Sequence, residues 1–361
     1  MKVSLRPLTP LWTGDNEGIS GELRVTGLMG SLRWWFEALV RANGHYACDP
    51  TTSPCRYEPG KQICAACWLF GATGWSRRFR LCADGLGPEQ WYVTVNPQVQ
   101  QMHEGWLKRL YHPNSKVLWG NALELDIRPY SHAETVEPLL RALLVLMSRH
   151  GALGAKTQNG LGAFDFDAPA DQYRGAIRKF FGCPPKGVLS GNGKRNKPRW
   201  FDLSHTIFLD FLVPDSGVYG TRQAVRYPAD AHTAYDGYVL PIAYDIRFKS
   251  QGRHFRTGEG EDVGLRPLLK GFLRGRARDP EDVVGSAARS RERTASRVFV
   301  THLYRRNPQE PYQFRIWVHL PPDQDVEQAA VRDQIRSFVT TRMFRGSHAT
   351  VHSWADIQEA L

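Results

Sequence analysis

The chain has 361 residues, of which 42% are hydrophobic, so it is long enough to bury the cores of two domains. Its 47 lysines and arginines exceed its 36 aspartates and glutamates, and the net charge of +11 predicts a polyanionic partner, nucleic acid rather than a membrane surface. We find no signal-peptide core or lipidation motif, and Arg141 interrupts the longest apolar run (139–147), so we expect a cytoplasmic protein without a membrane span. Six cysteines are too few for a disulfide-built scaffold.

Hydrophobic periodicity predicts two units that each run strand, helix, strand, strand, helix, strand, the order of a ferredoxin-like or RRM-like fold. In the first unit, the expected helices cover residues 30–42 and 134–150, and the expected strands cover residues 2–8, 79–83, 91–95, 123–127 and 163–166. One of the three middle strand candidates is surplus to the motif.

The second unit follows the polar stretch 187–199, which is typical of a linker or flexible loop. Its expected elements are strands at 205–213, 298–303, 314–320 and 349–354 and helices at 261–275 and 323–344, with a tyrosine-rich insertion after the first strand. We therefore predict an α+β fold of tandem ferredoxin-like (RRM-like, βαββαβ) domains with insertions. The first domain spans residues 1–185, with a cysteine-rich insertion at 44–67, and the second spans residues 200–361.

A glycine-rich loop at residues 151–162 is the first candidate for ligand binding. Its glycines let the backbone approach a ligand closely, while its polar side chains supply donors for phosphates or base edges. A helix C-cap at Gly151 and a tight turn at Asn159-Gly160 are the structural alternative. The predicted RNA contacts in this loop are Lys156, Thr157, Gln158, Asn159 and Gly160.

The start of the first helix is the second candidate. Two glycines and a serine place backbone N–H groups at its expected N-terminus, which favours phosphate binding, and a tryptophan can stack on an unpaired base. Arginines and a glutamate spaced by four residues predict a basic face away from the apolar stripe, although solvated arginines without a ligand are the alternative. The residues concerned are Gly27, Gly30, Ser31, Arg33, Trp34, Glu37 and Arg41, of which Gly27 and Glu37 are not themselves predicted contacts.

Two more basic clusters extend the predicted nucleic-acid surface. Trp75, Arg77, Arg78 and Arg80 follow the cysteine segment, and Arg266, Lys270 and Arg274 recur every four residues on the basic helix. The charged stretch up to Arg297 either orders on nucleic acid or is a solvated insertion. From these clusters we predict RNA contacts at Arg77, Arg78, Lys270 and Arg274.

The segment between Gly44 and Cys67 contains one aliphatic side chain larger than alanine, Ile63, so it cannot build a hydrophobic core of its own. Cys48, Cys55, Cys64 and Cys67 follow the spacing Cys-x6-Cys-x8-Cys-x2-Cys, which can close a tetrahedral, structural zinc site, with His45 as a spare ligand. Reduced cysteines packed against the domain are the alternative.

Sequence motifs of catalysis are mostly missing: the chain has no HExxH, GxSxG or Walker A motif. Asp15, in the polar turn 12–18, could orient a 2′-hydroxyl or bind a metal in RNA cleavage, although a turn aspartate more often caps backbone groups. A metal-independent nuclease could use His45 or His132, but the twelve histidines are scattered without catalytic spacing and give it no support.

Four segments together resemble the family of the first RAMP subunit of the type III-B CRISPR effector, the Cmr complex. They are residues 8–14 (LTPLWTG), 26–39 (TGLMGSLRWWFEAL), 67–75 (CWLFGATGW) and 156–162 (KTQNGLG). The resemblance is specific over residues 1 to about 168. It is weaker beyond, where residues 296–302 (SRVFVTH) and 314–317 (FRIW) are similar to the family's second half.

The resemblance implies two ferredoxin-like folds at one end of a crRNA-guided antiviral complex, near the crRNA 3′ portion and the target RNA 5′ portion. The family's glycine-rich loop maps onto residues 154–162 and its helix-start motif onto residues 27–34. We therefore expect a non-catalytic RNA-binding subunit whose partners are crRNA, single-stranded target RNA and other Cmr-complex RAMP subunits. In that family, a neighbouring subunit cleaves the target with an aspartate after its first strand, so Asp15 keeps an endoribonuclease alternative open. A zinc-stapled assembly protein is the third interpretation.

Overall fold

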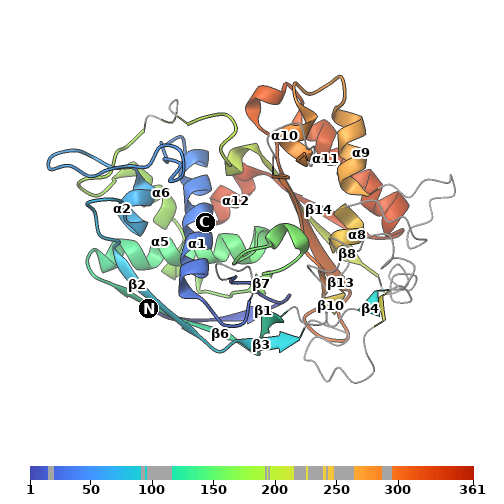
Figure 1. Cartoon of the computed structure of the whole chain (residues 1–361), viewed down its shortest axis with the longest axis horizontal. Coiled ribbons are helices and arrows are strands. Elements are labelled where there is room, and N and C mark those ends of the chain that lie inside the picture. The colour runs from blue at the N-terminus through green and yellow to red at the C-terminus, as the bar shows by residue number, and fades with distance from the viewer. Residues whose placement is uncertain are drawn as a thin grey trace.

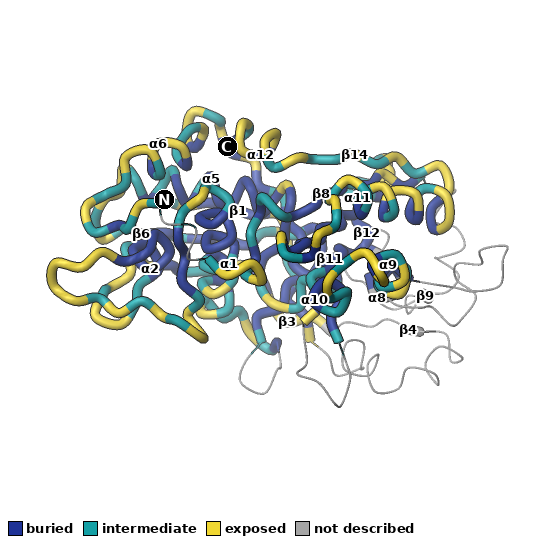
Figure 2. Tube along the Cα trace, turned by 90° about the horizontal axis from the view of Figure 1, so that it is seen from above, coloured by how far each residue is buried: buried dark blue, intermediate teal, exposed yellow. Residues whose placement is uncertain are grey.

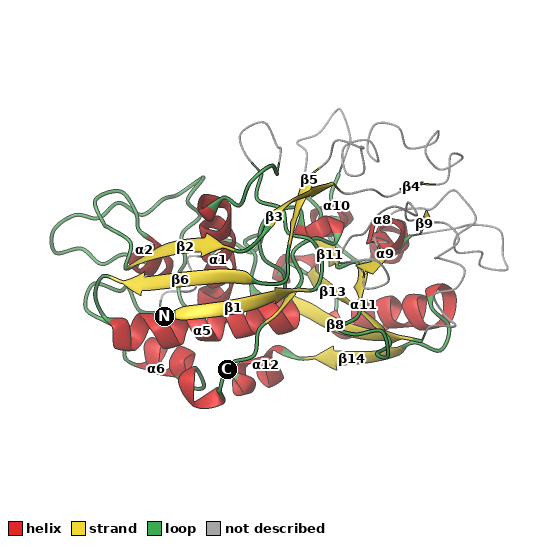
Figure 3. Cartoon of the chain, turned by 90° about the horizontal axis from the view of Figure 1, so that it is seen from below, coloured by secondary structure: helices red, strands yellow, loops and turns green. Residues whose placement is uncertain are grey.

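A computed structural model describes residues 1–14, 20–90, 94–95, 116–191, 193, 196–214, 225–226, 239–240, 243–247, 264–286 and 295–361. The fold is α+β, and two larger antiparallel sheets form its framework. Helices α1 and α5 cover one face of the first sheet, and the strands of the second sheet come from the C-terminal half of the chain (Figures 1 and 3).

The first sheet consists of β1 (Lys2–Pro7), β2 (Phe79–Asp84), β6 (Leu123–Pro129) and β7 (Phe164–Asp165), in the order β2-β6-β1-β7. All of its pairings are antiparallel. Helix α1 (Val25–Ala42) connects β1 to the β2 edge, and helix α5 (Ala133–His150) connects β6 to β7. Numbered along the unit, the strands therefore stand in the order 4-1-3-2.

The predicted periodicities form these elements. In β6, the alternate side chains of Leu123, Leu125 and Ile127 are buried, as expected for a strand with one face on the core. Helix α1 buries Leu28, Leu32, Trp35, Phe36 and Leu39 along one stripe. It begins at Val25 rather than at the predicted residue 30, so the glycines expected before the helix lie inside it.

The second sheet has the order β10-β12-β13-β8-β14, with β11 also paired to β13. Its strands are β8 (Thr206–Val213), β10 (Val239–Leu240), β11 (Val298–Val300), β12 (Leu303–Tyr304), β13 (Tyr312–His319) and β14 (His348–His352). Because β11 and β12 pair in succession with β13, they act as one interrupted strand. The main strands again follow the order 4-1-3-2.

Four short helices share a hydrophobic core with this sheet: α8 (Ala243–Arg247), α9 (Leu265–Leu273), α10 (Pro280–Val284) and α11 (Gln328–Ser337). Helix α12 (Trp354–Ala360) packs against the first unit instead, since its Ile357 belongs to the core of that unit. The helix predicted over 323–344 is divided into a 3-10 turn (Pro322–Gln324), α11 and a π-helical turn (Phe338–Met343). In the described part of the chain, no helix is both long and apolar enough to cross a membrane.

Three predicted segments require comment. Gly87–Gln90 (β3) pairs with Lys116–Trp119 (β5) in a separate ladder, whereas the expected strand 91–95 is described only at Thr94–Val95 (β4), paired with Val225–Arg226 (β9). The tyrosine-rich insertion lies largely outside the described residues. The stretch predicted as a linker is docked instead, because Ile63 exchanges backbone hydrogen bonds with Gly187 (3.0 Å) and Leu189 (2.7 Å).

An aromatic layer joins the two units. Trp35 of α1 lies 6.2 Å from Trp317 of β13, and Trp34 lies 4.4 Å from Phe201, measured between ring centroids. Figure 2 shows the buried residues continuing from one unit into the other. The seam is therefore part of the core, and side chains from both units can build one site.

Candidate nucleic-acid interface

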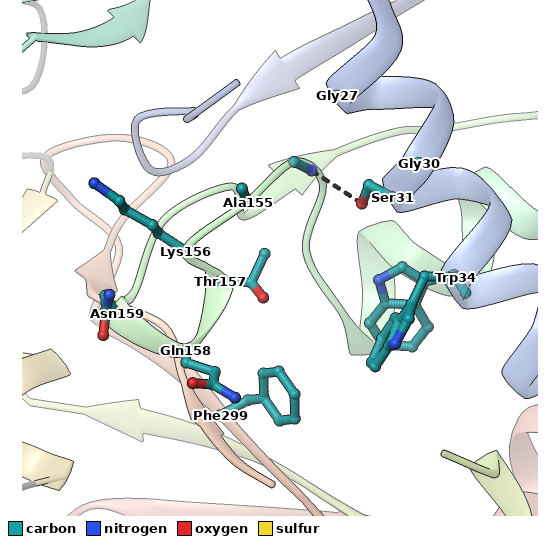
Figure 4. Close-up of a pocket in the computed structure, with 12 residues that line it drawn as sticks. Gly27, Gly30, Ser31, Trp34, Ala155, Lys156, Thr157, Gln158, Asn159 and Phe299 are labelled. Atoms are coloured by element: carbon teal, nitrogen blue, oxygen red, sulfur yellow. Dashed lines mark hydrogen bonds between the residues drawn. The ribbon is translucent and has the colours of Figure 1, made fainter. Parts of the chain in front are cut away.

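The start of α1 and the glycine-rich loop, far apart in the sequence, face each other across a pocket of about 580 Å³ (Figure 4). The first unit contributes most of the lining residues, and the second unit contributes Phe299 of β11. The lining residues are Gly27, Gly30, Ser31, Trp34, Trp35, Gly154, Ala155, Lys156, Thr157, Gln158, Asn159 and Phe299. The structure thus brings together the two segments that the sequence singles out independently.

Backbone contacts fix the loop. The Gly154 N–H donates to Ser31 Oγ (3.0 Å) and the Ala155 N–H donates to the Trp12 carbonyl (2.8 Å), so the loop is tied to α1 and to the segment after β1. Gly154 has a φ of +86°, and a Cβ there would lie 2.6 Å from the Trp12 carbonyl oxygen. Glycine is required for this close approach.

Lys156 supplies the charge of the pocket. Of the twelve lining residues in the described part of the chain, it alone carries a formal charge at neutral pH. Its backbone is left-handed, with a φ of 55°, and its Nζ lies 3.2 Å from the centroid of the Trp12 ring. Burial lowers the pKa of Lys156 to about 8.

Aromatic rings form one wall. Trp34 is partly buried, with its ring centroid 6.0 Å from that of Phe299, and Phe299 in turn stacks on Trp317 at 5.1 Å. Packed rings hold the indole in place while part of it borders the pocket. Such a surface suits stacking of an unpaired base.

The prediction that free backbone N–H groups of Gly27, Gly30 and Ser31 form a phosphate site is wrong. Because α1 begins at Val25, the N–H of Gly27 already donates to the Arg24 carbonyl at 3.0 Å, and Gly30 and Ser31 lie within the helical ladder. Gly30 contributes open space instead, since a Cβ there would meet no atom within 4 Å. Ser31 contributes its hydroxyl.

The second half of the loop is used within the protein. Gln158 Nε2 donates to the Ser296 carbonyl, and Arg247 Nη1 donates to Asn159 Oδ1 (3.1 Å). The predicted RNA contact at Gly160 is wrong, because this residue is buried and its carbonyl accepts from the His302 N–H at 3.2 Å. Gln158 and Asn159 still border the pocket, but their side chains also link the two units.

The basic face predicted on α1 is also wrong. Arg33 pairs with Glu37 (Nε to Oε1, 2.8 Å) and donates to the Gly71 carbonyl (2.9 Å) and to Cys67 Sγ (3.3 Å). The arginine is therefore directed toward the cysteine-rich segment, which covers the side of the helix that a helical wheel leaves open to solvent.

Arg41 is buried, with 7% of the residue exposed. Its guanidinium donates to the carbonyls of Phe201 (3.0 Å), Cys48 (3.2 Å) and Ala47 (3.3 Å), and it lies over the Trp200 ring at 5.1 Å. These contacts exclude it from an RNA surface and make it an anchor for the segments around it.

The remaining basic clusters lie outside the pocket lining. Arg78 is partly buried and lies over the rings of Trp75 (4.3 Å) and Trp68 (5.0 Å), whereas Arg77 is exposed, and both stay predicted contacts. On α9, Lys270 is paired with Glu281 (Nζ to Oε1, 3.0 Å). Arg274, at the end of α9, is exposed.

The four predicted cysteines converge. The ligand atoms of Cys48, Cys55, Cys64 and Cys67 all lie within 4.8 Å of one another, with Cys48 Sγ 3.3 Å from Cys67 Sγ and 3.7 Å from Cys64 Sγ. Tetrahedral zinc with Zn–S bonds of about 2.3 Å needs sulfur atoms roughly 3.8 Å apart. The cluster can therefore hold a metal ion, and its donor set fits zinc.

Of the residues proposed for RNA cleavage, the two that the structure describes, His45 and His132, do not line the pocket. Asp15 lies outside the described residues. His45 accepts a hydrogen bond from the Gly191 N–H at 2.8 Å and stacks on Phe181, and it does not join the cysteines. His132 is the N-cap residue before α5 and has a left-handed conformation, with its ring 5.5 Å from that of Trp68.

A second cluster of side chains that can bind a metal ion was not predicted from the sequence. His150, at the end of α5, meets Asp210 of β8 and His352 of β14 at the seam between the units. Burial lowers the pKa of His150 to about 3. Because the three residues are far apart in the sequence and belong to three elements, no local sequence motif predicts the cluster.

The family model of the RAMP superfamily matches residues 4–165. The match covers the part of the chain that holds the first sheet, α1, α5 and most of the pocket, and it confirms the resemblance at the level of the RAMP superfamily. No protein with a curated description matches the chain.

Solved structures give weaker likenesses. An apo crystal structure of Cmr1 from Pyrococcus furiosus is 13% identical, with a TM-score of 0.47, and the match covers 96% of this chain and 97% of that one. A chain of the type III-B Cmr-beta complex bound to cognate target RNA, solved by cryo-electron microscopy, is 11% identical with a TM-score of 0.45, over 94% of this chain and 98% of that one. These values are too low to transfer a property of those proteins to this chain.

Proposed function

We propose that the protein is a non-catalytic, RNA-binding subunit of a type III-B CRISPR effector, the Cmr complex. The observation that carries the proposal is the pocket between α1 and the glycine-rich loop, which unites two of the four segments of the RAMP resemblance. The RAMP-superfamily match over residues 4–165 and the net charge of +11 support it. On this proposal the partners are crRNA, single-stranded target RNA and neighbouring RAMP subunits, and the protein acts in antiviral defence in the cytoplasm.

The pocket suits one nucleotide of a single strand. An unpaired base can stack on the exposed part of Trp34 beside Gly30, where no side chain restricts approach. Lys156 then neutralises an adjacent phosphate, and the Ser31 and Thr157 hydroxyls can bond to phosphate or sugar oxygens. Exposed arginines such as Arg77 and Arg274 add sequence-independent attraction at longer range.

The architecture proposed for this subunit is a tandem of ferredoxin-like domains, residues 1–185 and 200–361. Its support is the strand order 4-1-3-2, which both sheets share. The second domain completes the pocket through Phe299 and holds the loop through Ser296 and Arg247. We expect its remaining surface to contact neighbouring subunits.

Structural zinc in the cysteine cluster is part of the same proposal. Four thiolates leave no open coordination position, so the ion would fold the insertion 44–67 rather than take part in chemistry. Arg33 donates to Cys67 Sγ at 3.3 Å and would offset the negative charge that four thiolates give to the site.

Filling the pocket tests the proposal without damaging the fold. In Gly30→Leu, the new side chain would point into open space and lie beside Trp34, its neighbour at i+4. We expect single-stranded RNA to bind about 5- to 150-fold more weakly, because stacking of a base contributes about 1–3 kcal/mol. The measurement is fluorescence anisotropy with labelled RNA at several salt concentrations.

Gly271→Leu is the matched control. Gly271 also lies within a helix, α9, and a Cβ there also meets nothing within 4 Å, yet it does not line the pocket. Equal RNA affinity of the two variants would contradict the proposed site. A denaturing gel of the same samples tests the nuclease alternative, since shortened RNA would contradict a purely binding role.

A further inference from the structure

Three metal-ligand side chains converge at the seam between the two units, away from the cysteine cluster. His150 is the last residue of α5, Asp210 lies in the middle of β8, and His352 is the last residue of β14. One ligand atom from each lies within 4.8 Å of the other two. One ligand therefore comes from the first unit and two come from the second.

The sheet register places the two ligands of the second unit on one face. Thr350 pairs with Asp210 and His352 pairs with Phe208, so Asp210 and His352 are diagonal neighbours across β8 and β14. His352 Nε2 lies 2.9 Å from Asp210 Oδ2. This contact holds both groups close to the separation that two ligands of one ion require.

A hydrogen-bond network among the three side chains does not account for the environment of His150. The residue is 9% exposed, and its Nδ1 is buried without a hydrogen-bond partner among the described residues. Its ring meets the His352 ring edge-on, with 4.7 Å between centroids. Burial of an unpaired ring nitrogen disfavours the folded state, and a bound ion would remove that cost.

The ligand types, together with a neighbouring arginine, indicate which kind of ion the site would bind. Arg315 of β13 is buried, with its Nε 3.8 Å from Asp210 Oδ1, so it offsets part of the carboxylate charge. Calcium and magnesium prefer oxygen ligands, usually with more than one carboxylate, whereas imidazole nitrogens suit zinc and similar transition metals. The ligand set favours the second class.

We propose that His150, Asp210 and His352 bind a divalent transition-metal ion of the zinc class. The ion joins α5 of the first unit to β8 and β14 of the second. Because the protein supplies three ligands, one position stays open to water or to a ligand from another molecule. This site is independent of the RNA-binding proposal and of the cysteine cluster.

Metal counting on the full-length protein tests the site. The protein is loaded with Zn²⁺, desalted and measured by atomic emission, together with the variants His352→Gln and Asp210→Asn. We expect each variant to lose one zinc equivalent per chain relative to the wild-type protein. His348→Gln is the matched control, since His348 lies on the same strand but is exposed and outside the cluster, and it should lose none.

Equal zinc content in the wild-type protein and both variants would overturn the proposal. Loss of zinc counts only for variants whose circular dichroism and melting match the His348→Gln protein. Cobalt(II) loading of the wild-type protein gives a readout that needs no variant. We expect one cobalt ion per chain without the intense thiolate charge-transfer absorption, whereas thiolate-type spectra for all bound cobalt would also overturn the site.

Discussion

Both sides of helix α1 carry residues that the sequence predicts as RNA contacts, but only one side is accessible in the structure. One side, with Gly30, Ser31 and Trp34, borders an open pocket. The other side, with Arg33 and Arg41, is closed by the cysteine-rich insertion and by the segment near Phe201. Small and aromatic residues remain accessible, while the arginines, which seemed the natural RNA ligands, are used inside the protein.

This difference teaches that charge alone does not locate a nucleic-acid site in a chain with long insertions. Arg41 donates to three backbone carbonyls, so its charge stabilises the packing of the insertion. Lys156, in contrast, has no carboxylate partner among the described residues and lines the pocket. We therefore expect variants of the closed side to change stability, and variants of the open side to change RNA binding.

The largest effect is expected at the cysteine cluster. Cys64→Ser removes one of the four proposed zinc ligands. Because metal binding contributes folding free energy to a segment without its own core, we expect the free energy of unfolding to fall by several kcal/mol. Urea unfolding checks this change, with the exposed Cys183 as control (Cys183→Ser). If both variants unfold like the wild-type protein, the insertion does not depend on a metal.

The next largest effect is expected at Arg41. Arg41→Ala leaves Glu37 without this ion-pair partner and three buried carbonyls without a donor, so we expect a loss of about 3–5 kcal/mol in unfolding free energy. The folded protein should bind RNA with unchanged affinity. Arg336→Ala, on the exposed part of α11, should change stability by no more than about 0.5 kcal/mol. Reduced RNA affinity in stably folded Arg41→Ala protein would break the comparison.

A smaller effect is expected at Lys156. Lys156→Ala should lower the free energy of unfolding by about 0.5–2 kcal/mol, through loss of the cation–π contact with Trp12. It should also lower the slope of log affinity against log salt by about 0.7, the value for one phosphate contact on a single strand. Lys179→Ala is the control, since Lys179 is exposed on α6 (Ala176–Gly182) and does not line the pocket. Identical salt slopes for the two variants would remove Lys156 from the site.

The smallest effect is expected from pH. Burial lowers the pKa of Lys156 to about 8, so in free protein the ammonium is mostly charged at pH 7 and mostly neutral at pH 9. RNA affinity should therefore fall as pH rises from 7 to 9, by no more than Lys156→Ala loses at pH 7. Lys156→Arg stays charged over this range and should show a flat profile. A flat wild-type profile would contradict the assigned pKa.

Much of the framework could be predicted because it depends on local periodicity. The apolar stripes of α1 and α5 and the alternation of β6 are properties of short windows, and the structure contains all three elements, although α1 begins at Val25 rather than at residue 30. The cysteine cluster was also predictable, since a segment with Ile63 as its only larger aliphatic residue needs another source of stability.

What could not be predicted depends on distant packing. A helical wheel places Arg33 and Arg41 away from the apolar stripe, but it cannot show that the cysteine-rich insertion will cover them. The seam cluster of His150, Asp210 and His352 forms only when the two units dock. The role of Gly160 likewise follows from its contact with His302, which belongs to the second unit.

The most direct measurement is photocrosslinking of full-length protein to single-stranded RNA that contains 4-thiouridine, followed by mass spectrometry of the crosslinked peptides. We predict crosslinks within residues 27–34 and 154–159, which line the pocket. Those crosslinks should decrease in Gly30→Leu and persist in Gly271→Leu. Crosslinks confined to the clusters around Arg77 or Arg274, with none at the pocket, would contradict the central claim.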